Sequence, residues 1–146
     1  MLLRAWIPPV ILMCLIFAAS TDIGSTTHTS RIIGPFLRWL NPDVTQSTIE
    51  LVQMTIRKGG HAAEYGILTL LFWRGLRLLS PQTDGWSART AKWAISLSFL
   101  YACSDEFHQS FVPSRGASVW DVLLDTTGAT LAIGALWLFG RLRKRW

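Results

Sequence analysis

Residues 119–139 read VWDVLLDTTGATLAIGALWLF, and this run decides the fold. It contains two acidic residues, Asp121 and Asp125, and no basic residue. A helix that crosses the hydrocarbon core of a bilayer needs about 20 mostly apolar residues. The run from about Val119 to Phe139 therefore predicts a transmembrane helix. Its two acids, both near the start, are not what a purely hydrophobic anchor needs.

Three further apolar segments precede this run. They extend from about Ala5 to Ser20, from about Gly60 to Trp73 (reaching back toward Ile49 if that helix begins early), and from about Trp93 to Phe107. Half of the 146 residues are hydrophobic and only 16% are charged, against about 25% in a typical soluble domain. We therefore expect an all-α fold, a four-helix polytopic transmembrane bundle that forms one domain over residues 1–146. The composition excludes a disordered chain, a coiled coil and an ordinary soluble enzyme.

Two features near the N-terminus need interpretation. Arg4 followed by a short apolar run and FAAS at residues 17–20 is also typical of a cleavable signal peptide, but the full apolar length and Pro8-Pro9 favour a retained helix. After it, apolar residues recur at helical spacing opposite Arg31 and Arg38, which predicts a short amphipathic helix lying on the membrane surface. These apolar residues are Ile32, Ile33, Phe36, Leu37 and Leu40.

The boundaries between the segments carry turn and capping signals. Asn41-Pro42-Asp43 ends the interfacial helix, and STIE at residues 47–50 has the form of a capping box that opens the second membrane helix. Residues 79–88 and 111–118, each with a Pro and a Gly, predict short loops. Cys14 and Cys103 each lie inside an apolar run, so we expect neither a disulfide nor a cysteine metal site.

The distribution of basic residues predicts the orientation in a bacterial inner membrane, because Lys and Arg concentrate on the cytoplasmic side. Four spans place nine basic residues on one side and five on the other. The nine are Arg4, Arg74, Arg77, Arg89, Lys92, Arg141, Arg143, Lys144 and Arg145, and the five are Arg31, Arg38, Arg57, Lys58 and Arg115. We therefore expect both termini in the cytoplasm.

Ionisable residues gather at the opposite, outer ends of the last three spans. The set consists of His61 and Glu64 in the second span, Asp105, Glu106 and His108 with the polar Gln109 in the third, Arg115 in the loop between the third and fourth, and Asp121 and Asp125 in the fourth. A charge at the bilayer centre costs about 2.5–3.5 kcal/mol on insertion scales, so such residues indicate a functional site by default. The alternative is an ion-paired network that only joins the helices.

Helical geometry brings some of these groups to common faces. At 100° per residue, Lys58, His61 and Tyr65 share a face, and Glu64 flanks His61. In the last span Asp121 and Asp125 share a narrow stripe with Gly128, Ala132 and Ala135, small residues that let helices pack closely. Gly59-Gly60 permits either close approach or a kink beside Lys58.

Three blocks of this sequence resemble the VanZ-like family of small integral membrane proteins. Residues 57–68 (RKGGHAAEYGIL) are similar to its K-x-x-H-x-x-E-Y-x-x-L block, residues 104–115 (SDEFHQSFVPSR) to S-D-E-x-H-Q-x-F-V-P-x-R, and residues 121–128 (DVLLDTTG) to D-x-x-x-[ND]-x-x-G. The blocks occur in order over a core of about residues 57–134. The resemblance implies a membrane enzyme that acts on phosphate-containing lipid linkages, polyprenyl-phosphate-linked envelope glycans among them.

Such chemistry assigns roles to residue types. Lys58 and Arg115 are candidates to hold the phosphoryl oxygens, with Tyr65 and Gln109 positioning the headgroup. His61 is the candidate nucleophile or general base, oriented by a carboxylate such as Glu106 or Asp121, while Asp105 or a second carboxyl group serves the leaving group. The predicted catalytic set is thus His61, Glu64, Asp105, Glu106, Asp121 and Asp125, for a lipid phosphoester hydrolase or transferase.

Other functions remain open on the sequence. We expect no cofactor, although the carboxylates with a His are also ligands that Mg²⁺ or Mn²⁺ would accept. The cluster alternatively binds or transports anionic headgroups or a glycopeptide antibiotic, as a resistance accessory, or the chain is a structural subunit with contact surfaces at Trp73, Trp93, Trp120 and Trp137. The partners we expect are membrane lipids and a second copy of the chain. A short basic tail beside a span argues against nucleic acid.

Overall fold

The structure is a computed structural model that describes residues 2–21, 26–80, 85–112 and 116–146, with the backbone alone for residues 26–31. Across these residues it contains five helices and no strand, which confirms the all-α class. The helices are α1 (Leu2–Ser20), α2 (Thr26–Leu40), α3 (Gln46–Leu79), α4 (Ala88–Gln109) and α5 (Val119–Leu142).

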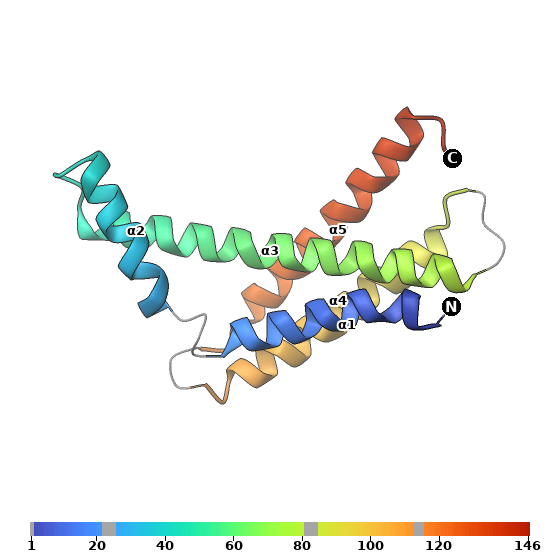
Figure 1. Ribbon diagram of the computed structural model, residues 1–146, viewed down its shortest axis with the longest axis horizontal. Coiled ribbons are helices and arrows are strands. Elements are labelled where there is room, and N and C mark those ends of the chain that lie inside the picture. The colour runs from blue at the N-terminus through green and yellow to red at the C-terminus, as the bar shows by residue number, and fades with distance from the viewer. Residues whose placement is uncertain (1, 22–25, 81–84, 113–115) are drawn as a thin grey trace.

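The 34-residue helix α3 is the centre of the fold and contacts each of the other four helices. In Figure 1, α1 and α4 run along the C-terminal half of α3, and α5 crosses α3 near its middle. Helix α2 lies apart from them, against the N-terminal part of α3, where Gly34 approaches Ile49. The core is small and lies between α1, α3, α4 and α5. Its buried apolar members are Ile16, Tyr65, Leu68, Phe72, Ala94, Ala102 and Val122.

Helices α3 and α5 cross with their backbones in contact. A Cβ atom built on Gly128 would lie 2.2 Å from the carbonyl oxygen of Ala62, and one built on Gly66 would lie 3.3 Å from the Cβ of Ala132. The predicted small-residue face is therefore confirmed at Gly128 and Ala132. It is wrong at Ala135, which is exposed because α5 diverges from α3 beyond the crossing.

Of the two alternatives at Gly59-Gly60, a close approach or a kink, the first is wrong for the described residues. A Cβ atom built on either glycine meets none of their atoms within 4 Å. The start of α3 differs as well: its N-cap is Thr45, two residues before the predicted Ser47, and the Thr45 side chain accepts a hydrogen bond from the backbone N–H of Thr48 at 3.3 Å. Thr45 and Ser47 each have a hydroxyl group that can accept a hydrogen bond from the backbone N–H three residues later. Capping at Thr45 makes the helix about half a turn longer.

Two helices, α1 and α5, are long and apolar enough to cross a membrane. Only 17% and 22% of their most hydrophobic windows are buried, so they do not resemble the core helix of a soluble protein. Helix α3 carries Arg57, Lys58 and Glu64 near its middle, and α4 carries charged residues toward both ends, which lowers the hydropathy of both helices. Many large apolar side chains face outward, among them Leu3, Leu15, Ile67, Leu100 and Leu131.

The four central helices alternate in direction, and this gives the bundle two different ends. At the end called here the site end, Ser20 of α1 meets Asp105 of α4, and Lys58 of α3 meets Asp121 of α5. At the opposite end, the rings of Trp73, Trp86 and Trp146 pack against one another with centroids 5.7–6.2 Å apart.

Candidate functional site

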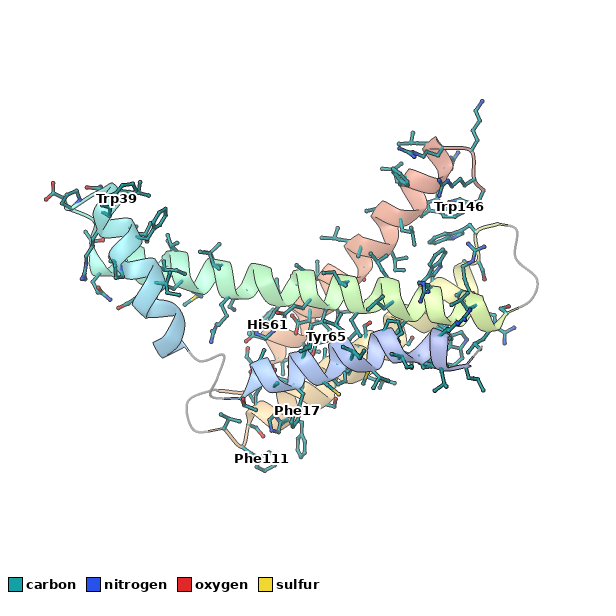
Figure 2. All side chains as sticks on the ribbon, viewed as in Figure 1. Phe17, Trp39, His61, Tyr65, Phe111 and Trp146 are labelled. Atoms are coloured by element: carbon teal, nitrogen blue, oxygen red, sulfur yellow. The ribbon has the colours of Figure 1, made fainter. Side chains whose placement is uncertain are left out.

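A pocket of about 90 Å³ opens at the site end, between α3, α4 and α5. Helix α3 supplies one wall with Arg57, Lys58 and His61, which is the basic side of the pocket. Helices α4 and α5 supply the facing wall, called here the α4–α5 wall, with Glu106, Gln109, Asp121, Leu124 and Asp125; Gly116 completes the lining. Figure 2 shows His61 and Tyr65 on α3 where α5 passes beneath it.

The basic wall is tied to α5 and to its own helix. Lys58 Nζ lies 3.0 Å from Asp121 Oδ1, and both side chains are partly exposed. His61 Nδ1 lies 3.9 Å from Glu64 Oε2, one turn away on the same helix. Glu64 therefore flanks His61, as the helical spacing predicts, while Glu106 and Asp121 line the same pocket as His61.

A buried hydrogen-bond network holds the α4 side of the pocket. Ser20 Oγ donates to Asp105 Oδ2 at 2.8 Å, and Gln109 Nε2 donates to the same oxygen at 3.0 Å and to Ser20 Oγ at 3.3 Å. All three side chains are buried. The network joins α1 to α4 and fixes Gln109, which also lines the pocket.

The start of α5 is fixed by Glu106. Its Oε1 accepts a hydrogen bond from the backbone N–H of Ser118, the residue that caps α5. One buried carboxylate of α4 thus sets where α5 begins, and the first turns of α5 then place Asp121 and Asp125 in the pocket. Both Asp105 and Glu106 are buried, so both carboxyl groups of α4 point into the bundle.

Asp125 is the most enclosed carboxyl group of the pocket. Its side chain is 5% exposed, and its Oδ1 has no hydrogen-bond partner within the part of the chain that the structure describes. It interacts electrostatically with Asp121, Asp105, Glu106 and Glu64, so five carboxyl groups lie near one another at the site end. Among the described residues, nevertheless, no group of three His, Cys, Asp or Glu side chains has positions that would hold a metal ion.

The structure brings most of the predicted site residues together. Lys58, His61, Glu106, Gln109, Asp121 and Asp125 line the pocket. Glu64 lies beside His61, and Asp105 behind Gln109. Tyr65 is fully buried below the pocket and packs on the ring of Tyr101, so it does not reach the lining. Arg115 lies outside the described residues.

Two contributors were missing from the predicted set. Arg57 lines the pocket directly beside Lys58, and Ser20 orders the network behind it. The sequence signal for Arg57 was its position directly before Lys58, a predicted phosphate-binding residue. Ser20 carried a weaker signal, a small polar residue at the end of an apolar helix. Which face of α1 meets α4 depends on tertiary packing, so spacing along the chain could not place Ser20.

Comparison with known proteins gives one match. Neither a curated protein nor a solved structure matches the chain. The model of the VanZ/LLP1 family matches residues 5–140, which include all three sequence blocks and all the residues lining the pocket. The resemblance read from residues 57–128 is thereby confirmed and extended to α1. The chain belongs to the VanZ/LLP1 family.

Proposed function

We propose that this protein is a membrane-embedded enzyme that acts on the phosphate-containing headgroup of a lipid or of a lipid-linked envelope glycan. The pocket carries this proposal. Two cationic side chains and an imidazole line one wall, and carboxyl groups with an amide line the other. Guanidinium and ammonium groups stabilise phosphoryl oxygens, and imidazole and carboxyl groups transfer protons.

The proposed arrangement in the bilayer has four spans, α1, α3, α4 and α5, with the site end at the outer leaflet and both termini in the cytoplasm. The opposite end supports this orientation, because basic residues cluster there: Arg74 donates to the carbonyl of Arg4, and Arg77 stacks 4.9 Å from the ring of Trp73. Lys and Arg concentrate on the cytoplasmic side of membrane proteins.

Helix α2 is the proposed interfacial helix of this arrangement. Its residues Ile32, Phe36, Trp39 and Leu40 are all more than half exposed, although they are apolar. An exposed apolar stripe on an amphipathic helix is the surface that enters the headgroup region of a bilayer. Arg38, off this stripe, donates to Gln46 of α3 and so faces the protein.

The proposed reaction is phosphoester hydrolysis or transfer. Arg57 and Lys58 hold the non-bridging oxygens, and His61, flanked by Glu64, takes the proton from an attacking water or hydroxyl. The new P–O bond forms as the bond to the leaving oxygen breaks, and Glu106 supplies the proton that this oxygen needs. For hydrolysis the products are an alcohol and a phosphate-bearing fragment, so water is the only co-reactant.

The test uses the full chain in detergent with short-chain phospholipids and polyprenyl-phosphate sugars as substrates, and mass spectrometry of the products. We expect turnover that Glu106→Gln and His61→Gln reduce by at least about 100-fold each, as is typical for removal of an acid or base. Glu50→Gln is the matched control, since Glu50 is exposed on the same α3 helix and outside the pocket.

Binding without turnover by the unmodified chain would contradict the enzymatic proposal and favour a headgroup binder. Proton-gradient-dependent uptake into proteoliposomes would favour a transporter. Equal loss of folded protein for the pocket variants, but not for Glu50→Gln, would favour a structural network.

A further inference from the structure

Within the part of the chain that the structure describes, the α4–α5 wall holds an acceptor without a partner, Asp125 Oδ1, and an amide, Gln109, whose NH₂ group is held from behind. A carboxylate oxygen accepts hydrogen bonds, so the end of the Gln109 amide that faces Asp105 Oδ2 is the NH₂ group, at 3.0 Å. The carbonyl end, Oε1, is then the end that remains for the pocket that Gln109 lines.

Ser20 reinforces this orientation. Its hydroxyl donates to Asp105 Oδ2 and accepts from Gln109 Nε2, so both partners of the amide select the same end. Because these side chains are buried, a flipped amide would turn its carbonyl oxygen toward a carboxylate and leave a buried repulsion. Ser20 and Asp105 are therefore positioning residues that act through Gln109.

Asp125 adds a second acceptor on the same wall. Its Oδ1 is buried without a hydrogen-bond partner among the described residues, and the groups that act on it electrostatically are carboxyl groups. A buried polar atom without a hydrogen-bond partner destabilises the protein, and more so when it is charged. A ligand that brings a donor to this atom removes that destabilisation, whereas an apolar ligand does not.

We propose that the pocket selects phosphate-bearing headgroups with a hydrogen-bond donor, a hydroxyl or an ammonium group, beside the phosphate. The donor binds at Gln109 Oε1 and Asp125, while Arg57 and Lys58 hold the phosphate. This inference rests on the proposed function for the phosphate, and it adds the class of headgroup. Glycerol-type or sugar headgroups supply hydroxyl donors, and ethanolamine-type headgroups supply an ammonium donor.

The experiment measures the affinity of the full chain in detergent for three phosphates by isothermal titration calorimetry. Ethyl phosphate carries no donor, glycerol 1-phosphate carries hydroxyls, and ethanolamine phosphate carries an ammonium group. We expect at least one donor-bearing phosphate to bind about tenfold or more tightly than ethyl phosphate, the effect of one good hydrogen bond to a charged or buried group. The tighter of the two identifies the donor.

Variants locate the effect on the α4–α5 wall. Gln109→Leu removes the acceptor directly, and Ser20→Ala loosens the amide without touching the pocket lining. We expect Gln109→Leu to reduce the ratio of the affinities for the donor-bearing phosphate and for ethyl phosphate to about onefold. Ser20→Ala should reduce the preference partly, a change that a merely structural role would not produce. Ser110→Ala, at the exposed residue that follows α4, is the control.

The outcomes separate the two proposals. If all three phosphates bind with equal affinity, the donor inference is overturned and the phosphate site stands. If none binds to the folded chain, the proposed function fails as well. Because the comparison of three ligands needs only the unmodified protein, a variant that does not fold leaves the test intact.

Discussion

The two ends of the bundle differ in the type and the burial of their polar side chains. At the site end, Asp105, Glu106, Gln109 and Asp125 are buried and fixed by hydrogen bonds or enclosed by other carboxyl groups. At the opposite end, tryptophan rings stack on one another and on arginine, and no Lys or Arg in the described ranges is buried. Aromatic and basic groups at a bilayer surface anchor a helix without desolvating a charge. A buried carboxyl group carries a desolvation cost that such an anchor avoids, and this difference supports the site end as the place of the proposed chemistry.

The largest expected effect comes from separating the two helices that join these ends. Gly128→Leu places a side chain where the backbone carbonyl of Ala62 lies 2.2 Å from the Cβ position, so α5 must move away from α3. We expect a loss of more than about 3 kcal/mol of stability, beyond the usual range for overpacking, because a backbone cannot yield as a side chain does.

Thermal unfolding in detergent, followed by tryptophan fluorescence, measures this loss. Gly134→Leu is the matched control on the same helix, because a Cβ at Gly134 meets nothing within 4 Å. Equal stability of the two variants would show that close packing at the α3–α5 crossing does not stabilise the bundle.

We expect an effect of intermediate size when the buried hydrogen-bond network at the site end loses its carboxylate. Asp105→Ala leaves the hydroxyl of Ser20 and the NH₂ group of Gln109 buried without their acceptor. We expect a destabilisation of about 2–3 kcal/mol, together with the loss of headgroup selectivity. Asp43→Ala is the control, since Asp43 is exposed in the turn before α3. If the Asp105→Ala protein kept both its stability and its headgroup selectivity, the network would neither stabilise the fold nor orient Gln109.

The smallest effect belongs to the opposite end. Trp146→Ala removes ring contacts with Trp73 and Trp86 and a hydrogen bond from its indole to the carbonyl of Trp137. We expect a loss of about 1 kcal/mol and unchanged phosphate binding, because the aromatic cluster is remote from the pocket. Trp120→Ala, at an aromatic residue that is 76% exposed, should change neither the stability nor the phosphate binding. If Trp146→Ala altered phosphate affinity, the separation of the two ends would be wrong.

The sequence predicted the helices well because hydrophobic runs and small-residue spacing are local signals. The expected run from Val119 to Phe139 differs from α5 by only three residues at its end. The capping box at residues 47–50 was a fair signal placed two residues late, since Thr45, Ser47 and Thr48 are all hydroxyl residues. The close approach considered at Gly59-Gly60 was wrong for the described residues, because a glycine allows a close approach without showing that a neighbour is present.

The sequence predicted which residues belong to the site, but it did not predict which of them contact one another. That charged groups within apolar segments must converge follows from the cost of exposing them to lipid, and six of the predicted residues do line one pocket. Which carboxylate serves which partner depends on helix rotation and crossing. Thus Asp105 turned out to face Ser20 of α1 and orient Gln109, and Glu106 to hold the start of α5.

The length of α3 has a consequence for how the molecule sits in lipid. At 1.5 Å per residue, 34 residues extend about 51 Å, whereas a bilayer with its headgroup regions measures about 40–45 Å. In the proposed four-span arrangement α3 must lean by about 35° from the membrane normal to remain within that slab, inside the range known for transmembrane helices. The shorter α1, α4 and α5 match the hydrocarbon thickness and need no such slant. An inclined α3 would place α2 at the lipid surface, beside the opening of the pocket.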